Sequence, residues 1–348
     1  MKPATRTATV FAHAGAAMGC IAILAGCGST VPAAPNSSAV PLSAGGATQV
    51  YISQPAFTGN ASGSVVQFPI GASDNAVPTT TLATPQTNVN SYVAADKEGH
   101  IYVGAGTASP KVLVFPAGAS GSASPARTIS GSAASFSEAG PLAVDSESNL
   151  YVIDPAGSIS IFSPTANGAA PPERHIQGSL TQLADSTVPN AISVDVFGNI
   201  YVSLASTSPN ATAWKILVFS PSAEGNIAPA RVISAENNCS LDNSFRVALD
   251  STGNFYVACI VENETAITEF ASNGSSVAAP VKTIIGTATA TVVALSVDNA
   301  GNVYAVCYTQ NEGLSLEAFS AAGSGNITPA VRFTSGSLTS VFPQLAVR

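Results

Sequence analysis

The chain has 348 residues, of which 46% are hydrophobic and only 9% are charged, and its formal net charge is −8. An acidic chain without a basic patch is poorly suited to nucleic acid, so we expect no nucleic-acid partner. No apolar run after the N-terminal segment approaches the roughly 18 residues of a transmembrane helix, so the apolar composition indicates strands buried on both faces.

The N-terminal segment has the organisation of a signal peptide. Lys2 and Arg6 precede an uncharged stretch, residues 10–24, and the small residues Ala25 and Gly26 lead to Cys27. A basic start, a short apolar run and small residues at the cleavage position are typical of export signals. One interpretation is an ordinary secretory peptide followed by a chance cysteine.

The tetrad Leu-Ala-Gly-Cys at residues 24–27 resembles the lipobox of bacterial lipoproteins. The resemblance implies that residues 1–26 are removed, that Cys27 is lipidated, and that acyl chains anchor the protein to the cell envelope. Because glycine rather than aspartate follows Cys27, the outer membrane is expected in a Gram-negative cell. Removal of Lys2 and Arg6 changes the net charge from −8 to −10.

Residues 28–48 contain no charged and no aromatic side chain and are rich in Pro, Ser, Ala and Gly. Such a composition cannot form a core and is typical of a flexible tether. We therefore expect a signal peptide at 1–26, a lipidated tether at 27–46 and a single folded domain at 47–348.

One phrase recurs in the folded part, with Asp and Tyr always six residues apart. The copies occupy residues 95–103, 144–152, 194–202, 249–257 and 297–305. Asp caps a turn through backbone hydrogen bonds, and Gly or Asn supplies positive φ, so the phrase predicts a β-hairpin. The repeated Asp residues resemble a ring of carboxylates, but turn capping is the favoured interpretation of Asp96, Asp145, Asp195, Asp250 and Asp298.

A second phrase follows each hairpin: an apolar run that ends in Phe, and a Pro ten residues later. The pairs are Phe68/Pro78, Phe115/Pro125, Phe162/Pro172, Phe219/Pro229, Phe270/Pro280 and Phe319/Pro329. Apolar residues at successive positions predict a strand covered on both sides, and a short strand follows each Pro. Each repeat therefore has four strands, a to d, with a period near 50 residues, which is typical of propeller blades.

The two ends of the chain complete the count of blades. Residues 344–348 form a strand a with Arg348 at the Asp position, whereas residues 49–52 form a strand b without a preceding strand a. Joined, they make one blade. The sequence thus predicts an all-β, six-bladed β-propeller of four-stranded antiparallel blades, closed by N- and C-terminal strands that share a blade.

The phrase Asp-x-x-Gly-Asn-Ile-Tyr-Val resembles the NHL-type propeller repeat and its bacterial lyase and lactonase-like relatives, over about residues 47–348. The resemblance implies the architecture and does not specify an activity, because one fold hosts many functions.

Loop lengths indicate which face of the propeller is free to bind. Tyr-to-Phe spacings, which contain the b–c loops, are 17, 13, 11, 18, 14 and 15 residues. These loops share a face with the d–a loops, and variation is typical of the binding face of repeat proteins. The alternative is that the lengths of long loops vary without any functional role. The candidate ligand-binding residues on this variable-loop face are Asp154, Asp185, Asn190, Trp214, Glu236, Asp242, Arg246, Glu262, Glu264 and Glu312.

The catalytic sets of similar propellers are not found. Calcium-dependent gluconolactonases resemble this fold and place metal ligands five residues before the hairpin Asp, where this chain has Ser91, Gly140, Asn190, Phe245, Val293 and Pro343. Only Asn190 could be a ligand, and a hard cation needs about six oxygens. Streptogramin-type lyases use histidines, but His100 and His175 are expected to be surface residues. No metal, cofactor or catalytic residue is therefore assigned.

Basic residues recur just after the blade Pro, at Arg127, Arg174, Arg231, Lys282 and Arg332. On the outer strand they are expected to prevent edge-to-edge pairing. Of the remaining cysteines, Cys239 and Cys259 are expected to form a disulfide and Cys307 to remain free, because an exported protein is in an oxidising compartment. The alternative is three unpaired cysteines.

The favoured function is a monomeric, non-catalytic envelope lipoprotein that binds a protein, glycan or small ligand through its variable-loop face. The alternative is a lactonase- or lyase-like enzyme with a rearranged site at the channel mouth, and a third hypothesis is a purely structural surface protein.

Overall fold

The computed structural model describes residues 41–42, 46, 48–54, 63–83, 92–106, 109–184, 187–206, 215–233, 247–250, 252–261, 264–272, 280–286, 291–339 and 344–348. Within these ranges the side chains of residues 187–188, 205–206, 259–261, 264 and 285–286 are not described. All of these residues belong to the compact unit Ser37–Arg348, and only this unit is considered below.

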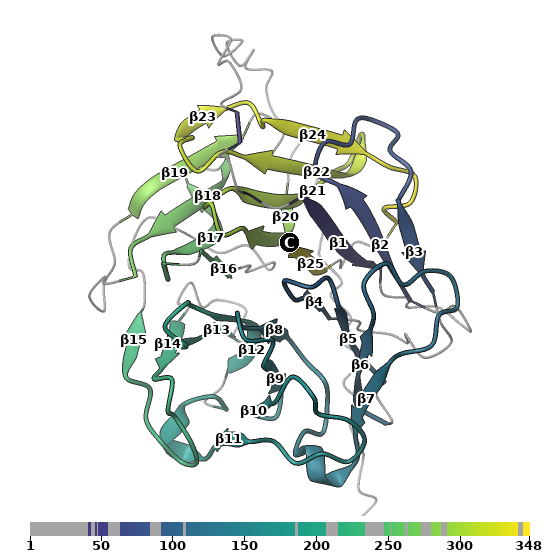
Figure 1. Ribbon diagram of the computed structural model, residues 1–348. Coiled ribbons are helices and arrows are strands. Elements are labelled where there is room, and N and C mark those ends of the chain that lie inside the picture. Colours follow the sequence, from purple (N-terminus) through teal and green to yellow (C-terminus); the bar gives the residue numbers. More distant parts are fainter. Residues whose placement is uncertain are drawn as a thin grey trace, which may run out of the picture. The chain divides into compact units, whose positions relative to one another are not determined.

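Six antiparallel sheets make up the unit, as the repeat predicts (Figure 1). Blade 1 contains β25 (Gln344–Val347), β1 (Gln49–Gln54), β2 (Ser64–Pro69) and β3 (Thr80–Leu82). Blade 2 contains β4 (Val93–Ala95), β5 (Ile101–Ala105), β6 (Lys111–Phe115) and β7 (Arg127–Ser130). Blade 3 contains β8 (Leu142–Val144), β9 (Leu150–Asp154), β10 (Ser158–Phe162) and β11 (Arg174–Gln177).

The second half of the unit repeats the pattern with longer strands. Blade 4 contains β12 (Thr187–Val194), β13 (Ile200–Ser206), β14 (Lys215–Phe219) and β15 (Arg231–Ile233). Blade 5 contains β16 (Val247–Leu249), β17 (Phe255–Val261), β18 (Glu264–Phe270) and β19 (Pro280–Gly286). Blade 6 contains β20 (Thr291–Val297), β21 (Val303–Thr309), β22 (Gly313–Phe319) and β24 (Val331–Thr334). Between β22 and β24, β23 (Gly325–Ile327) pairs in parallel with β19 of blade 5.

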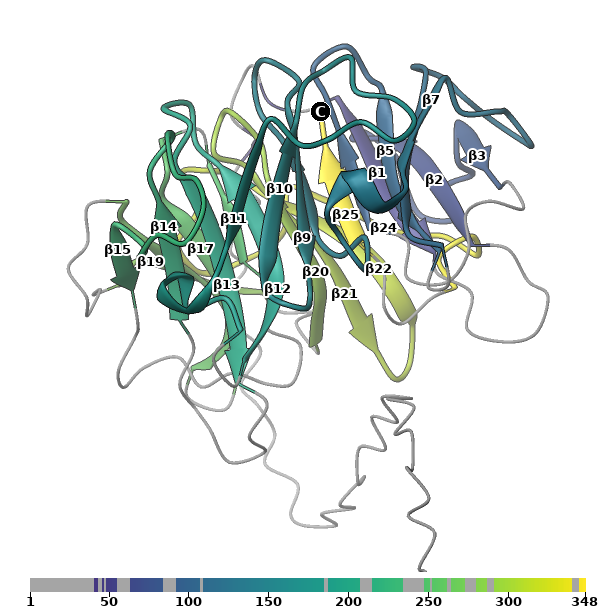
Figure 2. The same ribbon diagram turned by 90° about the horizontal axis from the view of Figure 1, so that it is seen from below.

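The blades form a closed ring. The innermost strands β4, β8, β12, β16, β20 and β25 contact one another in cyclic order, and they lie nearest the centre in Figure 1. Figure 2 shows the blades from the side. Helical structure in the described residues is limited to two 3-10 turns, η1 (Ser132–Ala134) and η2 (Ser179–Thr181), and no helix among them is long and apolar enough to cross a membrane.

The ends of the chain share blade 1, which confirms the predicted closure. β1 pairs with β25 in the register Val50↔Val347 to Ser53↔Gln344. Arg348 N donates to the carbonyl oxygen of Gln49 at 3.1 Å, and Gln49 N donates back to the carbonyl oxygen of Arg348 at 3.1 Å. Blade 1 therefore has a hydrogen-bonded break where the other blades have a covalent hairpin.

The core consists of layers between neighbouring blades. In β6, Val112 and Val114 pack towards blade 3, whereas Leu113 and Phe115 pack towards blade 1. Successive side chains of β6 thus face opposite neighbouring blades, and both faces of the strand are covered. This explains why strand c is apolar at successive positions. Leu42, within the segment expected to be a tether, also packs against the layer between blades 6 and 1.

The repeated Asp is a turn cap, as the sequence predicts. Asp195 is buried and accepts hydrogen bonds at Oδ1 from the backbone N of Phe197 (3.0 Å) and of Asn199 (2.8 Å). At Oδ2 it accepts from Asn199 Nδ2 (2.8 Å) and from Tyr201 Oη (3.2 Å). Gly198 completes the turn with a φ of 80°, a conformation that L side chains rarely adopt. One carboxylate therefore satisfies four donors of its own hairpin.

The basic residues of strand d have a different role from the one predicted. Arg332 pairs with Glu312 and Glu317 of its own blade. Each of the other four reaches a backbone carbonyl in the c–d turn of the next blade. The pairs are Arg127 with Ala166, Arg174 with Ala223, Arg231 with Ser272, and Lys282 with Ala321. We call these contacts the blade clasps. The outer strands are not open edges, because the same turn also forms a parallel bridge with strand d, as in Ile129↔Gly168. The clasps therefore tie blades together.

Blade 6 is joined to blade 1 in another way. Six residues after Phe68, where blades 2, 3, 4 and 6 have glycine, blade 1 has Asp74. Asp74 Oδ1 accepts from the backbone N of Thr334 at 3.1 Å, and Ser335 Oγ donates to the carbonyl oxygen of Ala76 at 2.6 Å. At this junction the side-chain acceptor of Asp74 takes the place of the parallel backbone bridge that joins other neighbouring blades, such as Ile129↔Gly168.

Candidate functional site

The two faces of the ring differ in their loops. The a–b hairpins occupy residues 96–100, 145–149, 195–199, 250–254 and 298–302, and each is five residues long. The b–c connections on the opposite face, at residues 55–63, 106–110, 155–157, 207–214, 262–263 and 310–312, differ widely in length. The predicted contrast between a uniform face and a variable-loop face is confirmed.

A central cavity of about 520 Å³ opens among the hairpins. Its wall is formed by the innermost strands and consists largely of Ala, Leu and Val. The hairpin carboxylates at its rim are occupied by their own turns, and the Arg348 side chain donates from Nε to the carbonyl oxygen of Lys97 at 3.0 Å. The uniform face therefore presents few polar groups that are aimed at a ligand.

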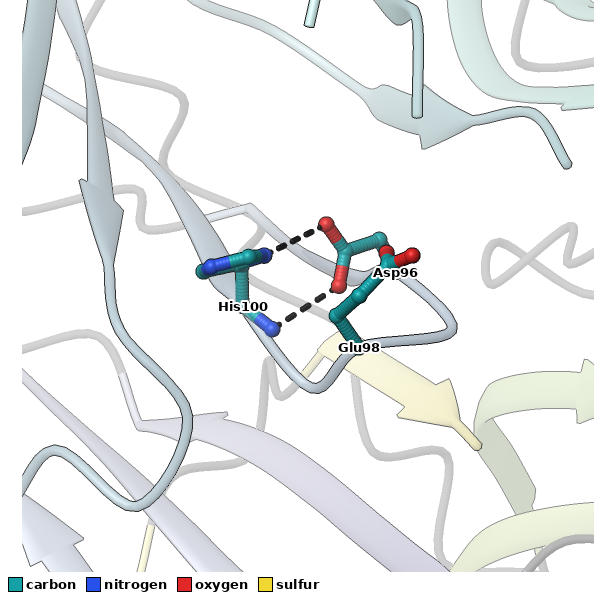
Figure 3. Close-up of side chains that lie close together, drawn as sticks. All are labelled: Asp96, Glu98 and His100. Atoms are coloured by element: carbon teal, nitrogen blue, oxygen red, sulfur yellow. Dashed lines mark hydrogen bonds and ion pairs between the residues drawn. The ribbon is translucent and has the colours of Figure 1, made fainter. Parts of the chain in front are cut away.

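Asp96, Glu98 and His100 lie close together in the blade 2 hairpin (Figure 3). His100 takes the position that Asn occupies in the other hairpins, and its Nδ1 lies 2.8 Å from Asp96 Oδ2. Asp96 also accepts from the backbone N of His100 (2.9 Å) and from Tyr102 Oη (3.2 Å). Burial raises the pKa of Asp96, but these hydrogen bonds and the nearby His100 outweigh it, so the pKa is lowered overall. Asp96 and His100 are therefore the turn-capping pair of this blade, whereas Glu98 accepts a hydrogen bond from Ser148 Oγ at 3.2 Å.

The hairpin tyrosines do not have the properties of catalytic bases. Burial first, and then the charge of the adjacent Asp, raises the pKa of Tyr151 and of Tyr201 to about 12. The phenols remain neutral hydrogen-bond donors near neutral pH.

Many of the predicted ligand-binding residues lie outside the described residues, namely Asp185, Trp214, Glu236, Asp242, Arg246 and Glu262. Glu264 begins β18, and its side chain is not described. Asp154, Asn190 and Glu312 can be placed. They belong to blades 3, 4 and 6, and none of them lines the central cavity or the pocket on blade 2 that is described below.

Asp154 ends β9 and organises the loops of blade 3. Only 5% of it is exposed, and it accepts from Ser137 N at 2.5 Å, from Ser137 Oγ at 2.8 Å and from Ala156 N at 2.9 Å. The carboxylate thereby fixes the d–a loop of blades 2 and 3 against the b–c loop of blade 3. Burial, and then the charge of Asp154, raises the pKa of the neighbouring Glu138.

Asn190 lies in β12 at a register shift between Pro189 and Ala191. Of the positions that hold metal ligands in gluconolactonases, the described ones are Gly140, Asn190 and Val293, and only Asn190 has a side-chain oxygen. The side chains at these three positions therefore offer one oxygen ligand, fewer than the roughly six that a hard cation takes.

Glu312 belongs to a charged group on blade 6. It forms an ion pair with Arg332, whose Nε also lies 3.4 Å from Glu317 Oε1. Glu317 is fully buried, and its Oε2 has no hydrogen-bond partner among the described residues. Burial raises the pKa of Glu317 and that of the adjacent thiol of Cys307.

The structure also shows a pocket that the sequence analysis did not single out. It has a volume of about 730 Å³ and lies on the variable-loop face of blade 2. Its polar lining consists of Ser109, Lys111, Thr128, Ser130, Ser132 and Ser137, and Pro110 and Phe136 add apolar surface. We call it the blade 2 pocket. The only signal in the sequence is the clustering of serines in residues 130–137, which is also typical of an ordinary loop.

The predicted disulfide cannot be placed. Cys239 lies outside the described residues, as does the side chain of Cys259 in β17. Cys307 is buried in β21 with a free thiol.

No family model matches the sequence, and no curated protein sequence matches it. Three solved structures are similar to the chain. A protein of unknown function from Bacteroides caccae is 11% identical with a TM-score of 0.56, over 87% of this chain and 99% of that chain. The Dos1 propeller is 12% identical over 80% of this chain and 68% of its own, with a TM-score of 0.44. A protein from Lactobacillus plantarum is 12% identical over 80% and 84%, with a TM-score of 0.47.

At these identities the similarity concerns the fold alone. The chain is a six-bladed β-propeller closed by strands from both of its ends.

Proposed function

We propose that the protein is an exported lipoprotein of the bacterial cell envelope, anchored through Cys27, and that its NHL-type propeller is a non-catalytic scaffold that binds a ligand or partner through the variable-loop face. The export signal and the Leu-Ala-Gly-Cys tetrad support the anchor.

The observation that carries the binding role is the contrast between the two faces. On the hairpin face, carboxylates such as Asp195 and Asp298 are saturated by donors of their own turns. On the variable-loop face, the blade 2 pocket is lined by several hydroxyl-bearing side chains and by Lys111. Polar groups that converge on a concave surface are the usual mark of a binding site.

A non-catalytic role is favoured over a lactonase- or lyase-like enzyme. Of the two histidines in the folded part, His100 pairs with Asp96, and His175 Nδ1 lies 3.1 Å from Ser160 Oγ in blade 3. Neither adjoins a described group that completes a nucleophile–base–carboxylate set. The enzyme alternative depends on Asn190 at the channel mouth.

The anchor is tested by the intact mass of protein purified from the envelope in detergent. We expect a mature chain that starts at Cys27 and carries a diacylglyceryl adduct. Cys27→Ser protein should leave the membrane fraction, and its full retention there would contradict the anchor.

Binding and catalysis are separated with the same purified protein. It is screened for hydrolysis of lactones and for lyase activity with and without calcium, and for binding to immobilised oligosaccharides and peptides. We expect binding without turnover. Calcium-dependent turnover that is lost in Asn190→Ala would establish the enzyme alternative, whereas neither binding nor turnover would favour a purely structural protein.

A further inference from the structure

We propose that the blade 2 pocket binds an acidic saccharide, with the anionic group of the sugar at Lys111 and its hydroxyl groups along the serines. This inference rests on the proposed function, because it names the ligand class of the variable-loop face.

The size and polarity of the pocket suit a hydrophilic ligand. Its volume of about 730 Å³ is within the range of roughly 300–1,000 Å³ that is typical of small-molecule sites. The lining includes the hydroxyl groups of Ser109, Thr128, Ser130, Ser132 and Ser137. A hydroxyl group can both donate and accept a hydrogen bond, so this wall can pair with the many hydroxyl groups of a sugar.

The strands place three of the lining residues on one surface. Lys111 pairs with Ser130 in the ladder between β6 and β7, and Leu113 pairs with Thr128. Because side chains two residues apart share a face of a sheet, the Lys111, Thr128 and Ser130 side chains lie on the same side of blade 2. The η1 turn and the residues after it then bring Ser132 and Ser137 to the same pocket.

Ser137 is held in one orientation by Asp154. Its hydroxyl group donates to the Asp154 carboxylate at 2.8 Å, and its backbone N donates to the same group. With its proton engaged, the hydroxyl oxygen of Ser137 can only accept a hydrogen bond from a ligand. This wall of the pocket therefore selects a ligand donor, such as a sugar hydroxyl group.

Lys111 supplies the charge preference. It is half-buried, it is the one charged side chain among the described lining residues, and it has no ion-pair partner within the described part of the chain. Asp154 lies behind Ser137 and not in the lining, so an anion is disfavoured at the Ser137 end and favoured at the Lys111 end. The pocket is therefore polarised along its length.

The test compares trigalacturonate with its fully methyl-esterified form, which has the same sugar hydroxyl groups and no carboxylate charge, by calorimetry with the full mature protein. We expect the acid to bind about tenfold more tightly than the ester, which is typical of one charge-assisted hydrogen bond. Lys111→Gln should remove this preference. Lys215→Gln is the matched control, because Lys215 begins β14 in blade 4 at the equivalent position and is exposed.

A second variant tests the location without changing the charge. Ser132 is exposed, and Ser132→Trp should fill the pocket and weaken both ligands, with an unchanged melting temperature. Equal affinity for acid and ester, or equal losses in Lys111→Gln and Lys215→Gln, would overturn the proposal. If the acid and ester fail these tests but other oligosaccharides or peptides bind the variable-loop face, the proposed scaffold function stands and the acidic-saccharide site is excluded. If nothing binds that face, both proposals are excluded.

Discussion

Arg127 of blade 2 donates from Nη1 to the carbonyl oxygen of Ala166 in blade 3 at 3.0 Å. The same guanidinium lies over the ring of Tyr102, 5.9 Å from its centroid. One side chain thus connects a strand, its own hairpin and the neighbouring blade.

The clasp should contribute measurably to stability. Arg127→Met keeps much of the aliphatic contact and removes the hydrogen bond to Ala166 and the contact with Tyr102. We expect the free energy of unfolding to fall by about 1–3 kcal/mol, the usual range for a hydrogen bond to a charged group. Urea denaturation measures this, with Lys215→Met on an exposed lysine as the control. Equal stability of the two variants would show that the clasps contribute nothing.

Loss of a hairpin cap should be more costly. Asp195→Ala removes the acceptor of four hydrogen bonds, including those from Asn199 Nδ2 and Tyr201 Oη. Unsatisfied buried donors cost about 1–3 kcal/mol each, although those near the surface recover water. We expect a loss of about 3 kcal/mol in urea denaturation. Asp195→Asn retains an acceptor oxygen and should lower the free energy of unfolding by less. A larger loss in Asp195→Asn than in Asp195→Ala would contradict the capping role.

Glu317 should make stability depend on pH in a defined direction. Its pKa is raised in the folded protein, mainly by burial and despite the opposing Arg332, Cys307 and Ser315. The folded state therefore binds more protons than the unfolded state between pH 4.5 and the folded pKa, so stability falls as the pH rises through that window. Each unit of difference between the folded and unfolded pKa changes the free energy of unfolding by about 1.4 kcal/mol across this window.

Glu317→Gln remains neutral and keeps a carbonyl oxygen for Arg332. We expect the variant to match the wild type near pH 4 and to be more stable at pH 8, in urea titrations at each pH. The control is Glu269→Gln in blade 5, which breaks the 2.9 Å ion pair with Lys282 and should be destabilising at pH 8. A stability difference between Glu317→Gln and wild type that does not change with pH would contradict the assignment.

The shared blade predicts a strong effect of a short truncation. Removal of residues 344–348 exposes the inner edge of β1. It also exposes part of the core layer in which Tyr51 packs together with Ala346 in the intact protein. We expect aggregation or a large fall in melting temperature, because an unpaired central strand is an aggregation site. Unchanged melting would show that β25 is not needed for closure.

The disulfide between Cys239 and Cys259 remains a prediction from the sequence. Non-reducing peptide mapping of envelope-purified protein should show this bridge and a slowly alkylated Cys307, since Cys307 is fully buried. Three alkylatable thiols after unfolding, or a bridge that includes Cys307, would exclude it.

The sequence predicted the blades because Asp, Tyr, Phe and Pro recur at spacings that local geometry fixes. An Asp195 to Tyr201 hairpin needs no information from outside its own blade. The clasps were misinterpreted because the partner of Arg127 is a backbone carbonyl 39 residues away, and no side chain marks it. The blade 2 pocket was not predicted for a similar reason. Its serines are brought together by two loops and by the buried carboxylate of Asp154, which lie apart in the sequence.

The break in blade 1 has a topological consequence. Arg348 and Gln49 exchange two backbone hydrogen bonds at a place where every other blade has a continuous turn. The break thus takes the place of one of six a–b turns around the ring, and β1 and β25 still complete a four-stranded blade. A gene in which this break is joined by a hairpin like that of Asp195, and opened at another hairpin instead, would encode the same ring from a circularly permuted chain.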